Sequence, residues 1–162
     1  MEHLKKYVSE INNFPNDGIV FKDINPIYLE PKIWNEIMFP LEILVSDTKP
    51  DYIAVIESRV FITASALAFK NKIGFIPIRK PYKLPGKLIG LNYKLEYGED
   101  RLEIQDDLFK KNSRILVIDD LLATGGTASA ACQLIKEAGG CLIGFSFLIE
   151  LTKLKGRSKL DP

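Results

Sequence analysis

Apolar residues in this chain occur in two patterns, continuous runs and helically spaced positions. Continuous apolar runs predict buried strands at 51–56, 73–78, 115–118 and 141–151. Apolar residues three or four positions apart predict helices at 4–11, 33–44, 61–70 and 128–138. Strands that alternate with helices in this way indicate an α/β fold with a doubly wound, mostly parallel sheet.

Proline and glycine mark the boundaries of these elements. Pro40 falls inside the second helical stretch, where a proline removes a backbone donor and costs roughly 3 kcal/mol. We therefore expect either a kink or a fresh helix start at Pro40. Residues 14–18 predict a turn, and Ile19–Phe21 predicts a short extended segment after it. Gly139-Gly140 predicts the end of the last helix.

Residues 81–105 have a different character, because prolines and glycines are mixed with lysines, tyrosines and glutamates. The segment is too long for an ordinary connection, and long loops in compact domains are usually functional. Residues 93–97 and 101–104 alternate enough to form a two-stranded flap. We expect Tyr82 and Tyr93 to pack within this flap.

Length and composition predict one domain, residues 1–162, with a sizeable core. The net charge of +1 gives no basic excess, so we expect no nucleic-acid partner. We expect no membrane association, because the apolar run 142–149 is too short to span a bilayer and the N-terminus shows no secretory signal. The two cysteines form no metal or redox motif, which favours a reducing cytoplasm. His3 is the only histidine, so a histidine-based active site is not expected.

The most specific chemistry follows the strand at 115–118. Asp119 and Asp120 precede a small-residue loop, Ala123-Thr124-Gly125-Gly126-Thr127, which leads into a helix. Backbone N–H groups at a helix N-terminus bind anions, and two carboxylates can accept hydrogen bonds from sugar hydroxyls. The alternative interpretation of the acidic pair is the start of a solvated loop. The alternative for the glycines is a turn with Thr127 as the helix N-cap, which has the same geometry as a phosphate site and can coexist with it. The pattern therefore predicts a sugar-phosphate site but is not specific alone.

Several further segments occur with this loop in a recognisable order. The stretch 117–127 resembles the phosphoribosyl-pyrophosphate motif of type I phosphoribosyltransferases, and Leu121-Leu122 is similar to the adenine-specific members. The segments that agree are 18–26, 57–59, 77–81, 83–86, 95–98, 102–104 and 151–157. The resemblance implies the type I phosphoribosyltransferase fold, with a small N-terminal hood over residues 1–30 and a mobile flap over 81–105.

The resemblance implies transfer of the phosphoribosyl group from phosphoribosyl pyrophosphate to adenine, giving AMP and pyrophosphate. In that interpretation Asp119 and Asp120 hold the ribose hydroxyls. Residues Ala123 to Thr127 bind the 5′-phosphate. The cations Arg59, Arg79 and Lys83 face the pyrophosphate. Mg²⁺ bridges the pyrophosphate and is held mainly through the substrate rather than by direct protein ligands. The family also implies a homodimer.

The resemblance also implies roles on the adenine side. Val20, Phe21, Lys22 and Leu121 would frame the base, with backbone groups from 20 to 22 reading its edge. Glu96 would handle the purine proton, with Tyr97 beside it on the flap. Without the motif, Glu96 would be interpreted as a solvated flap carboxylate, and Phe21 is as easily a core residue as a stacking platform.

One position departs from the family pattern. Val60 follows Glu57-Ser58-Arg59 where the family usually has glycine. If this position needs a positive φ, the valine reshapes the loop and weakens substrate binding. If the position has a helical φ, valine is tolerated. Val60 therefore leaves open a binding protein that senses phosphoribosyl pyrophosphate without turnover, and a third interpretation is transfer to another purine such as xanthine.

Overall fold

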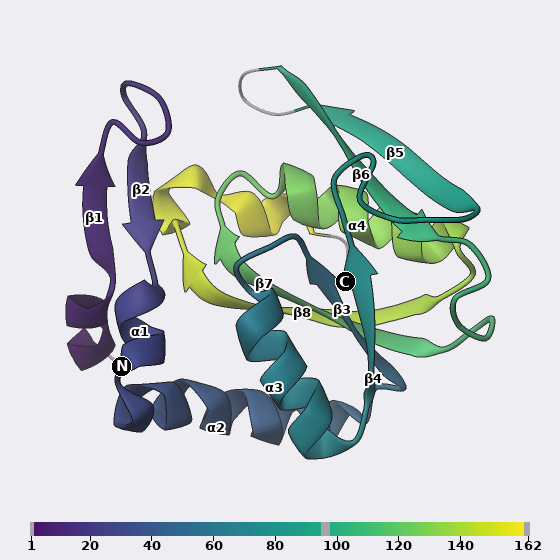
Figure 1. The fold of residues 1–162 in the computed structure, drawn as a ribbon, viewed down its shortest axis with the longest axis horizontal. Helices are drawn as coiled ribbons and strands as arrows, with labels where there is room; N and C mark the ends of the chain where they lie inside the picture. Colours follow the sequence, from purple (N-terminus) through teal and green to yellow (C-terminus); the bar gives the residue numbers. More distant parts are fainter. Residues whose placement is uncertain (1, 95–97, 161–162) are drawn as a thin grey trace. The chain divides into compact units, whose positions relative to one another are not determined.

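The computed structural model describes residues 2–94 and 98–160. The chain forms two compact units, residues 1–43 and residues 44–162, which we describe separately. The first contains a 3₁₀ helix and a two-stranded antiparallel sheet, followed by helices (Figure 1). These elements are η1 (Glu2–Tyr7), β1 (Ser9–Asn12), β2 (Val20–Asp23), α1 (Asn25–Leu29) and α2 (Pro31–Thr48), the last of which continues into the second unit. The single domain and its hood over residues 1–30 stay predictions.

The helix predicted at 4–11 is wrong in its second half. Residues 2–7 form a 3₁₀ helix, and Ser9–Asn12 is a strand paired antiparallel with Val20–Asp23. A short stretch with apolar residues at 4, 7, 8 and 11 fits a helical period, but pairing with a distant strand overrides so short a local pattern. The predicted turn at 14–18 and the extended segment after it are confirmed.

The helix α2 runs unbroken through Pro40, so the fresh helix start proposed there is wrong. Pro40 and Glu36 are both exposed. The Glu36 carbonyl, which loses its helical donor at position 40, can therefore bond to water instead of being buried without a partner.

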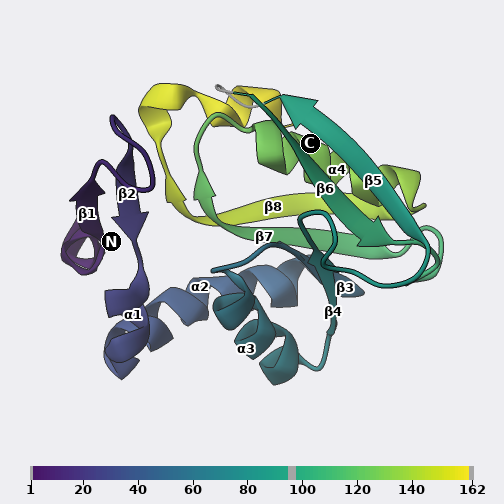
Figure 2. The ribbon, with the colours of Figure 1, turned by 45° about the horizontal axis from the view of Figure 1, so that its top comes forward.

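The second unit is built on a four-stranded sheet in the order β4-β3-β7-β8, with every neighbouring pair parallel. Its strands and their connecting helices are β3 (Tyr52–Ile56), α3 (Phe61–Asn71), β4 (Gly74–Ile78), β7 (Arg114–Leu122), α4 (Gly126–Glu137) and β8 (Cys141–Glu150). Figure 2 shows α3 on one face of this sheet and α4 on the other. The predicted doubly wound α/β fold is confirmed.

The position of β3 and β7 in the middle of the sheet explains why their sequences are continuous apolar runs. Both faces of the sheet are covered, so residues 53–56 and 115–118 are all buried. The main core cluster lies between β3, β4 and β7 of the sheet, a further strand β6 (Glu99–Gln105) and the helix α4. It contains Ala54, Ile56, Ile76, Ile78, Leu102, Ile104, Ile115, Val117, Ala130, Ala131, Leu134 and Ile135.

The predicted flap contains an antiparallel pair, β5 (Leu88–Lys94) and β6 (Glu99–Gln105). The two-stranded form is confirmed, but β5 begins five residues earlier than predicted, at Leu88 instead of Tyr93. The alternate residues Ile89, Leu91 and Tyr93 pack against the core cluster. This packing explains why the strand begins earlier in the chain than predicted. In Figure 2 the helix α4 lies between this hairpin and the sheet, and it contacts β5, β6, β7 and β8.

Two short 3₁₀ helices, η2 (Thr152–Leu154) and η3 (Gly156–Lys159), follow β8. Within residues 2–94 and 98–160, no helix combines the length and the apolar character that crossing a bilayer requires.

Candidate active site

The sheet topology brings three separate segments to one edge. The register pairs Ile56 with Ile78 and Val55 with Ile118, so the carboxyl ends of β3, β4 and β7 lie together. The connection through α3 leads from β3 to one side, and the connection through α4 leads from β7 to the other. Ligands of open α/β sheets bind at such a switch point. Residues 57–59 and the acidic pair meet there.

Asp119 and Asp120 lie inside β7, not after it, because the strand continues to Leu122. Each residue is only 9% exposed, so the interpretation of a solvated loop start is wrong. Asp119 Oδ1 accepts a hydrogen bond of 2.9 Å from the backbone N–H of Asp120. Burial, together with the neighbouring Asp120 carboxylate, raises the pKa of Asp119 well above its ordinary value.

Arg59 supplies the positive charge for this pair. Its Nη2 forms an ion pair with Oδ2 of Asp120. The same oxygen accepts no hydrogen bond of regular geometry within the described part of the chain. The acidic pair is therefore neutralised in part, yet one buried carboxylate oxygen retains the capacity to accept a hydroxyl.

Arg79 is held by a different carboxylate. Its guanidinium donates two hydrogen bonds of 3.2 Å to Glu57, and it lies 5.7 Å from the Phe61 ring centroid. Burial opposes ionisation of Glu57, but the bonds from Arg79 and from the Lys80 backbone outweigh it and lower the Glu57 pKa. Lys83 is exposed in the loop after β4 and adds a further positive charge near Glu57. The predicted cations are therefore grouped around the β3 and β4 ends.

The glycine loop ends where α4 begins. Gly125 has φ 82° and is the N-cap, so the helix starts at Gly126 and the predicted N-cap role of Thr127 is wrong. A left-handed φ is accessible to glycine without strain, and the first N–H groups of α4 have no partner within the helix, as at the start of any α-helix. The structure thus has a helix N-terminus after Gly125, and binding of an anion by residues 123–127 stays a prediction.

Gly156, the first residue of η3, packs against the backbone of this loop. A Cβ on Gly156 would meet the backbone oxygen of Ala123 well inside contact distance and would lie 3.0 Å from the Gly125 nitrogen. A Cβ on Gly125 would likewise collide with the Gly156 carbonyl. Sequence reasoning missed this contact, because no local pattern indicates which two glycines meet.

Val60 has φ −69° and ψ −11°, and its side chain is fully buried at the N-cap of α3. The helical alternative is therefore correct, and the premise that this position needs a positive φ is wrong.

Because valine here fills core space without backbone strain, Val60→Gly should destabilise the fold by roughly 1–3 kcal/mol and leave kcat/KM no higher than before. Thermal unfolding and steady-state kinetics of the two proteins check this expectation. An increase of several-fold in kcat/KM would restore the hypothesis that Val60 weakens substrate binding.

The adenine-side residues divide between the two units. Val20, Phe21 and Lys22 belong to β2 of the first unit, where Lys22 pairs with Glu10 and the Phe21 ring contacts Phe14. Leu121 is half-buried in β7 of the second unit. The structure therefore positions residues 20–22 only within the first unit and Leu121 only within the second. Glu96 and Tyr97 lie outside the described residues.

The prediction that both Tyr82 and Tyr93 pack is wrong for Tyr82 only. Tyr82 does not pack, because it is 99% exposed and has φ 65°. Tyr93 packs on the core cluster as expected, but its hydroxyl also donates a 3.1 Å hydrogen bond to Asp100. Lys80 and Asp100, which form an ion pair, were not singled out from the sequence.

Comparison with known proteins agrees with this geometry. Residues 27–161 match the family described as phosphoribosyl transferase domain. An adenine phosphoribosyltransferase of Prochlorococcus marinus (strain NATL2A) is 70% identical over 161 residues, which cover 99% of this chain and 94% of the relative.

Solved structures give the same result. Adenine phosphoribosyltransferase from Thermoanaerobacter pseudethanolicus has a TM-score of 0.93 and 43% identity, covering 99% of this chain and 93% of that one. The Saccharomyces cerevisiae enzyme, solved with adenine and D-2,5-dideoxy-2,5-imino-altritol 1,6-bisphosphate, has a TM-score of 0.90 and 38% identity, covering 99% and 93%. The chain therefore belongs to the phosphoribosyl transferase family and, within it, to the adenine phosphoribosyltransferases.

Proposed function

We propose that this protein transfers the 5-phosphoribosyl group from phosphoribosyl pyrophosphate to adenine, forming AMP and pyrophosphate in purine salvage. The observation that carries the proposal is the meeting of Arg59 with the buried Asp119-Asp120 pair at the sheet switch point. The adenine-bound structure of the yeast relative supports the choice of base.

The phosphoribosyl half of the substrate fits the β7–α4 segment. The unbonded N–H groups at the start of α4, with the hydroxyls of Thr124 and Thr127, bind the 5′-phosphate. Asp119 and Asp120 accept hydrogen bonds from the two ribose hydroxyls. Because both carboxylates are buried, these bonds form away from competing water and fix the sugar against the sheet edge.

The leaving group belongs with the cations at the ends of β3 and β4. As pyrophosphate departs, negative charge grows on it while the sugar becomes oxocarbenium-like. Arg59, Arg79 and Lys83 stabilise that growing charge, and such preorganised donors commonly contribute about 2.7–4 kcal/mol each. Arg59 is held beside the site by Asp120, and Arg79 by Glu57, so neither cation needs to be reoriented from bulk solvent.

On the adenine side, backbone groups of Val20, Phe21 and Lys22 read the base edge, and Leu121 packs on the ring. Glu96 takes part in proton transfer at the purine, with Tyr97 beside it. A carboxylate is sufficient for this step because the purine needs only one proton removed as its nitrogen attacks the sugar.

Mg²⁺ is the cofactor that we assign to this reaction. Among the described residues, no group of three or more His, Cys, Asp or Glu side chains could hold a metal. We therefore assign Mg²⁺ to the substrate, whose phosphate oxygens would hold most of its coordination sites, with no direct protein ligand. When bound, the ion would neutralise charge on the pyrophosphate. The homodimer and the cytoplasmic location stay proposals from the family resemblance and the cysteine usage.

A single assay tests the proposed function. Protein, Mg²⁺ and phosphoribosyl pyrophosphate are mixed with adenine, hypoxanthine, guanine or xanthine, and pyrophosphate release is followed. We expect release with adenine at least roughly 100-fold faster than with the other bases, since a site built to hydrogen-bond one base edge rejects bases that leave its groups unpaired.

Two alternatives make different predictions in the same assay. A sensor would bind phosphoribosyl pyrophosphate without release for any base, and a transferase for another purine would respond to that base instead. The conformation of Val60 removes the main argument for the sensor.

A further inference from the structure

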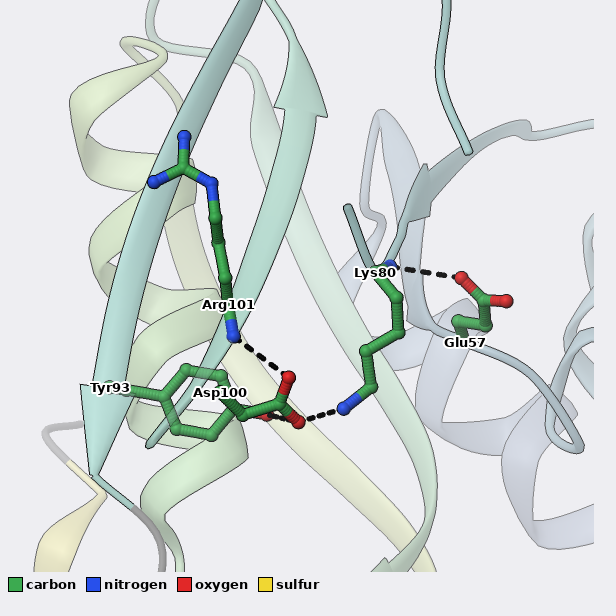
Figure 3. Close-up of polar contacts among 5 residues, drawn as sticks. All are labelled: Glu57, Lys80, Tyr93, Asp100 and Arg101. Carbon is green, nitrogen blue, oxygen red and sulfur yellow. Dashed lines mark hydrogen bonds and ion pairs between the residues drawn. The ribbon is translucent and has the colours of Figure 1, made fainter. Parts of the chain in front are cut away.

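Two acidic residues hold Lys80 just after the end of β4. Its backbone N–H donates a 2.9 Å hydrogen bond to Oε2 of Glu57, which directly follows β3. Its Nζ pairs with Oδ2 of Asp100, in the strand β6 of the hairpin. Figure 3 shows Lys80 between the two, with its backbone nitrogen facing Glu57 and its ammonium facing Asp100. Lys80 therefore links the carboxyl end of the sheet to the hairpin.

Asp100 can hold the Lys80 side chain because its own position is fixed. It lies directly opposite Tyr93 of β5, and its Oδ2 also accepts a 3.1 Å hydrogen bond from the Tyr93 hydroxyl. Its Oδ1 accepts a 2.8 Å bond from the backbone N–H of Arg101 (Figure 3). Both carboxylate oxygens are thus engaged within the hairpin, which makes Asp100 an ordered anchor for the cation.

The Glu57 carboxylate receives the Lys80 N–H and the guanidinium of Arg79 together. Its Oε2 accepts from the Lys80 N–H and from Arg79 Nε, and its Oε1 accepts from Arg79 Nη2, with both guanidinium bonds 3.2 Å long. The bond from Lys80 therefore fixes the carboxylate that orients the guanidinium. Because Arg79 presents Nε and Nη2 to Glu57, its two Nη1 N–H groups point away from Glu57 and can meet a phosphate oxygen.

The main chain on either side of Lys80 differs in order. Before it, Arg79 and Glu103 of β6 exchange backbone bonds of 2.9 and 2.8 Å. After it, the chain enters an exposed loop in which Tyr82 is 99% exposed and has φ 65°. The ion pair with Asp100 therefore fixes the residue at which the paired chain passes into the loop.

We infer that Lys80 is a positioning residue for the pyrophosphate side of the site. Held by Asp100, it keeps its N–H on Glu57, and Glu57 in turn keeps the Arg79 guanidinium aligned for the leaving group. The Lys80 ammonium stays with Asp100 and does not bind the pyrophosphate itself. This role rests on the proposed function, and it concerns the pyrophosphate rather than the sugar phosphate or adenine.

The experiment compares Lys80→Met, Lys80→Arg and Asp100→Ala with the wild type by calorimetric titration with pyrophosphate and Mg²⁺. Lys80→Met and Asp100→Ala should each raise Kd for pyrophosphate roughly 3- to 10-fold, the range expected when one hydrogen bond is weakened. Lys80→Arg keeps a cation for Asp100 and should retain most of the binding. Kd for ribose 5-phosphate and KM for adenine should stay unchanged in all three variants.

Lys87→Met is the matched control, because Lys87 forms an ion pair with Asp106 just beyond the ends of the same hairpin. It should leave Kd for pyrophosphate unchanged. The unfolding temperature of every variant should stay close to that of the wild type, since a partly exposed ion pair contributes little to stability. An effect on pyrophosphate matched by Lys87→Met, or an equal change in Kd for ribose 5-phosphate, would overturn the inference.

The double variant Lys80→Met/Arg79→Ala tests whether Lys80 acts through Arg79. It should bind pyrophosphate no more weakly than Arg79→Ala alone, and additive losses would contradict the positioning role. Asp100→Ala excludes a direct role for the ammonium. If that variant bound pyrophosphate as well as the wild type or more tightly, the Lys80 ammonium would be a direct ligand and the inference would be wrong.

The titrations need no turnover, so they separate this inference from the proposed function. A wild type that binds pyrophosphate but is inactive with every purine refutes the proposed function, while the binding data still decide the role of Lys80. A wild type that binds no pyrophosphate overturns the inference as well.

Discussion

Replacing Asp119 with asparagine should make the unliganded protein more stable and the enzyme much less active. The carboxylate is buried beside a second carboxylate, and both effects raise the pKa of Asp119 well above 3.8. Asparagine has nearly the same shape, and its oxygen can still accept the 2.9 Å bond from the Asp120 N–H. The substitution therefore removes an unfavourable charge and preserves the packing.

The pH dependence of this gain follows from the direction of the pKa shift. A raised pKa means that the folded protein binds the Asp119 proton more tightly than the unfolded chain does. The wild type therefore loses stability as pH rises from about 4 through the folded-state pKa, and no further above it. Asp119→Asn avoids that loss, so we expect its stability advantage over the wild type to grow across this range and its Tm at neutral pH to be higher than that of the wild type.

The Asp119→Asn enzyme should be less active than the wild type. A hydrogen bond from a ribose hydroxyl to a charged carboxylate contributes roughly 1.5–3 kcal/mol. Its loss should lower kcat/KM for phosphoribosyl pyrophosphate about 10- to 150-fold. Unfolding followed between about pH 4 and 8, combined with steady-state kinetics, tests both halves. Asp51→Asn, which changes an exposed carboxylate that bonds to the Arg114 backbone, is the control. An Asp119→Asn protein with no stability advantage at neutral pH would contradict this account.

Gly156→Ala should damage the phosphate loop through steric contact alone. Gly156 has no positive φ, so alanine suits its backbone conformation. The added Cβ, however, would collide with the Ala123 carbonyl and press on Gly125. Neither atom belongs to a flexible side chain, so the loop backbone itself has to move.

We expect two measurable consequences. Stability should fall by roughly 1–3 kcal/mol, as for other overpacked sites, which is roughly 2–12 °C in Tm. Displacement of the phosphate-binding N–H groups by about 1 Å should lower kcat/KM for phosphoribosyl pyrophosphate roughly 100-fold. Adenine binding, measured separately by fluorescence or calorimetry, should change little.

Gly144 offers a matched glycine elsewhere in the same unit. A Cβ there would find only the Leu116 Cδ1 atom, at an ordinary 3.8 Å. Gly144→Ala should therefore leave both Tm and the kinetic constants nearly unchanged. If the two alanine variants behaved alike, contact between Gly156 and the phosphate loop would not explain the loss.

Local pattern was sufficient to predict the central elements of this fold. The strands at 52–56 and 74–78 and the start of β7 are continuous apolar runs because both faces of a parallel sheet are covered. The order of strand, loop and helix around residues 119–127 was also predictable, because the acidic pair, glycines and helix follow one another within a dozen residues, while phosphate binding by this loop stays a proposal. Such short-range patterns depend only on neighbours along the chain.

Pairing between distant segments was beyond the reach of those patterns. Four features join residues from different segments. They are the pairing of the strand Ser9–Asn12, the ion pair of Arg59 with Asp120, the ion pair of Asp100 with Lys80, and the contact of Gly156 with Ala123. Register and packing select such partners, and a polar or glycine residue carries no local mark of the group it will meet. The helical φ of Val60 was likewise decided by the start of α3, where a buried valine fits the core.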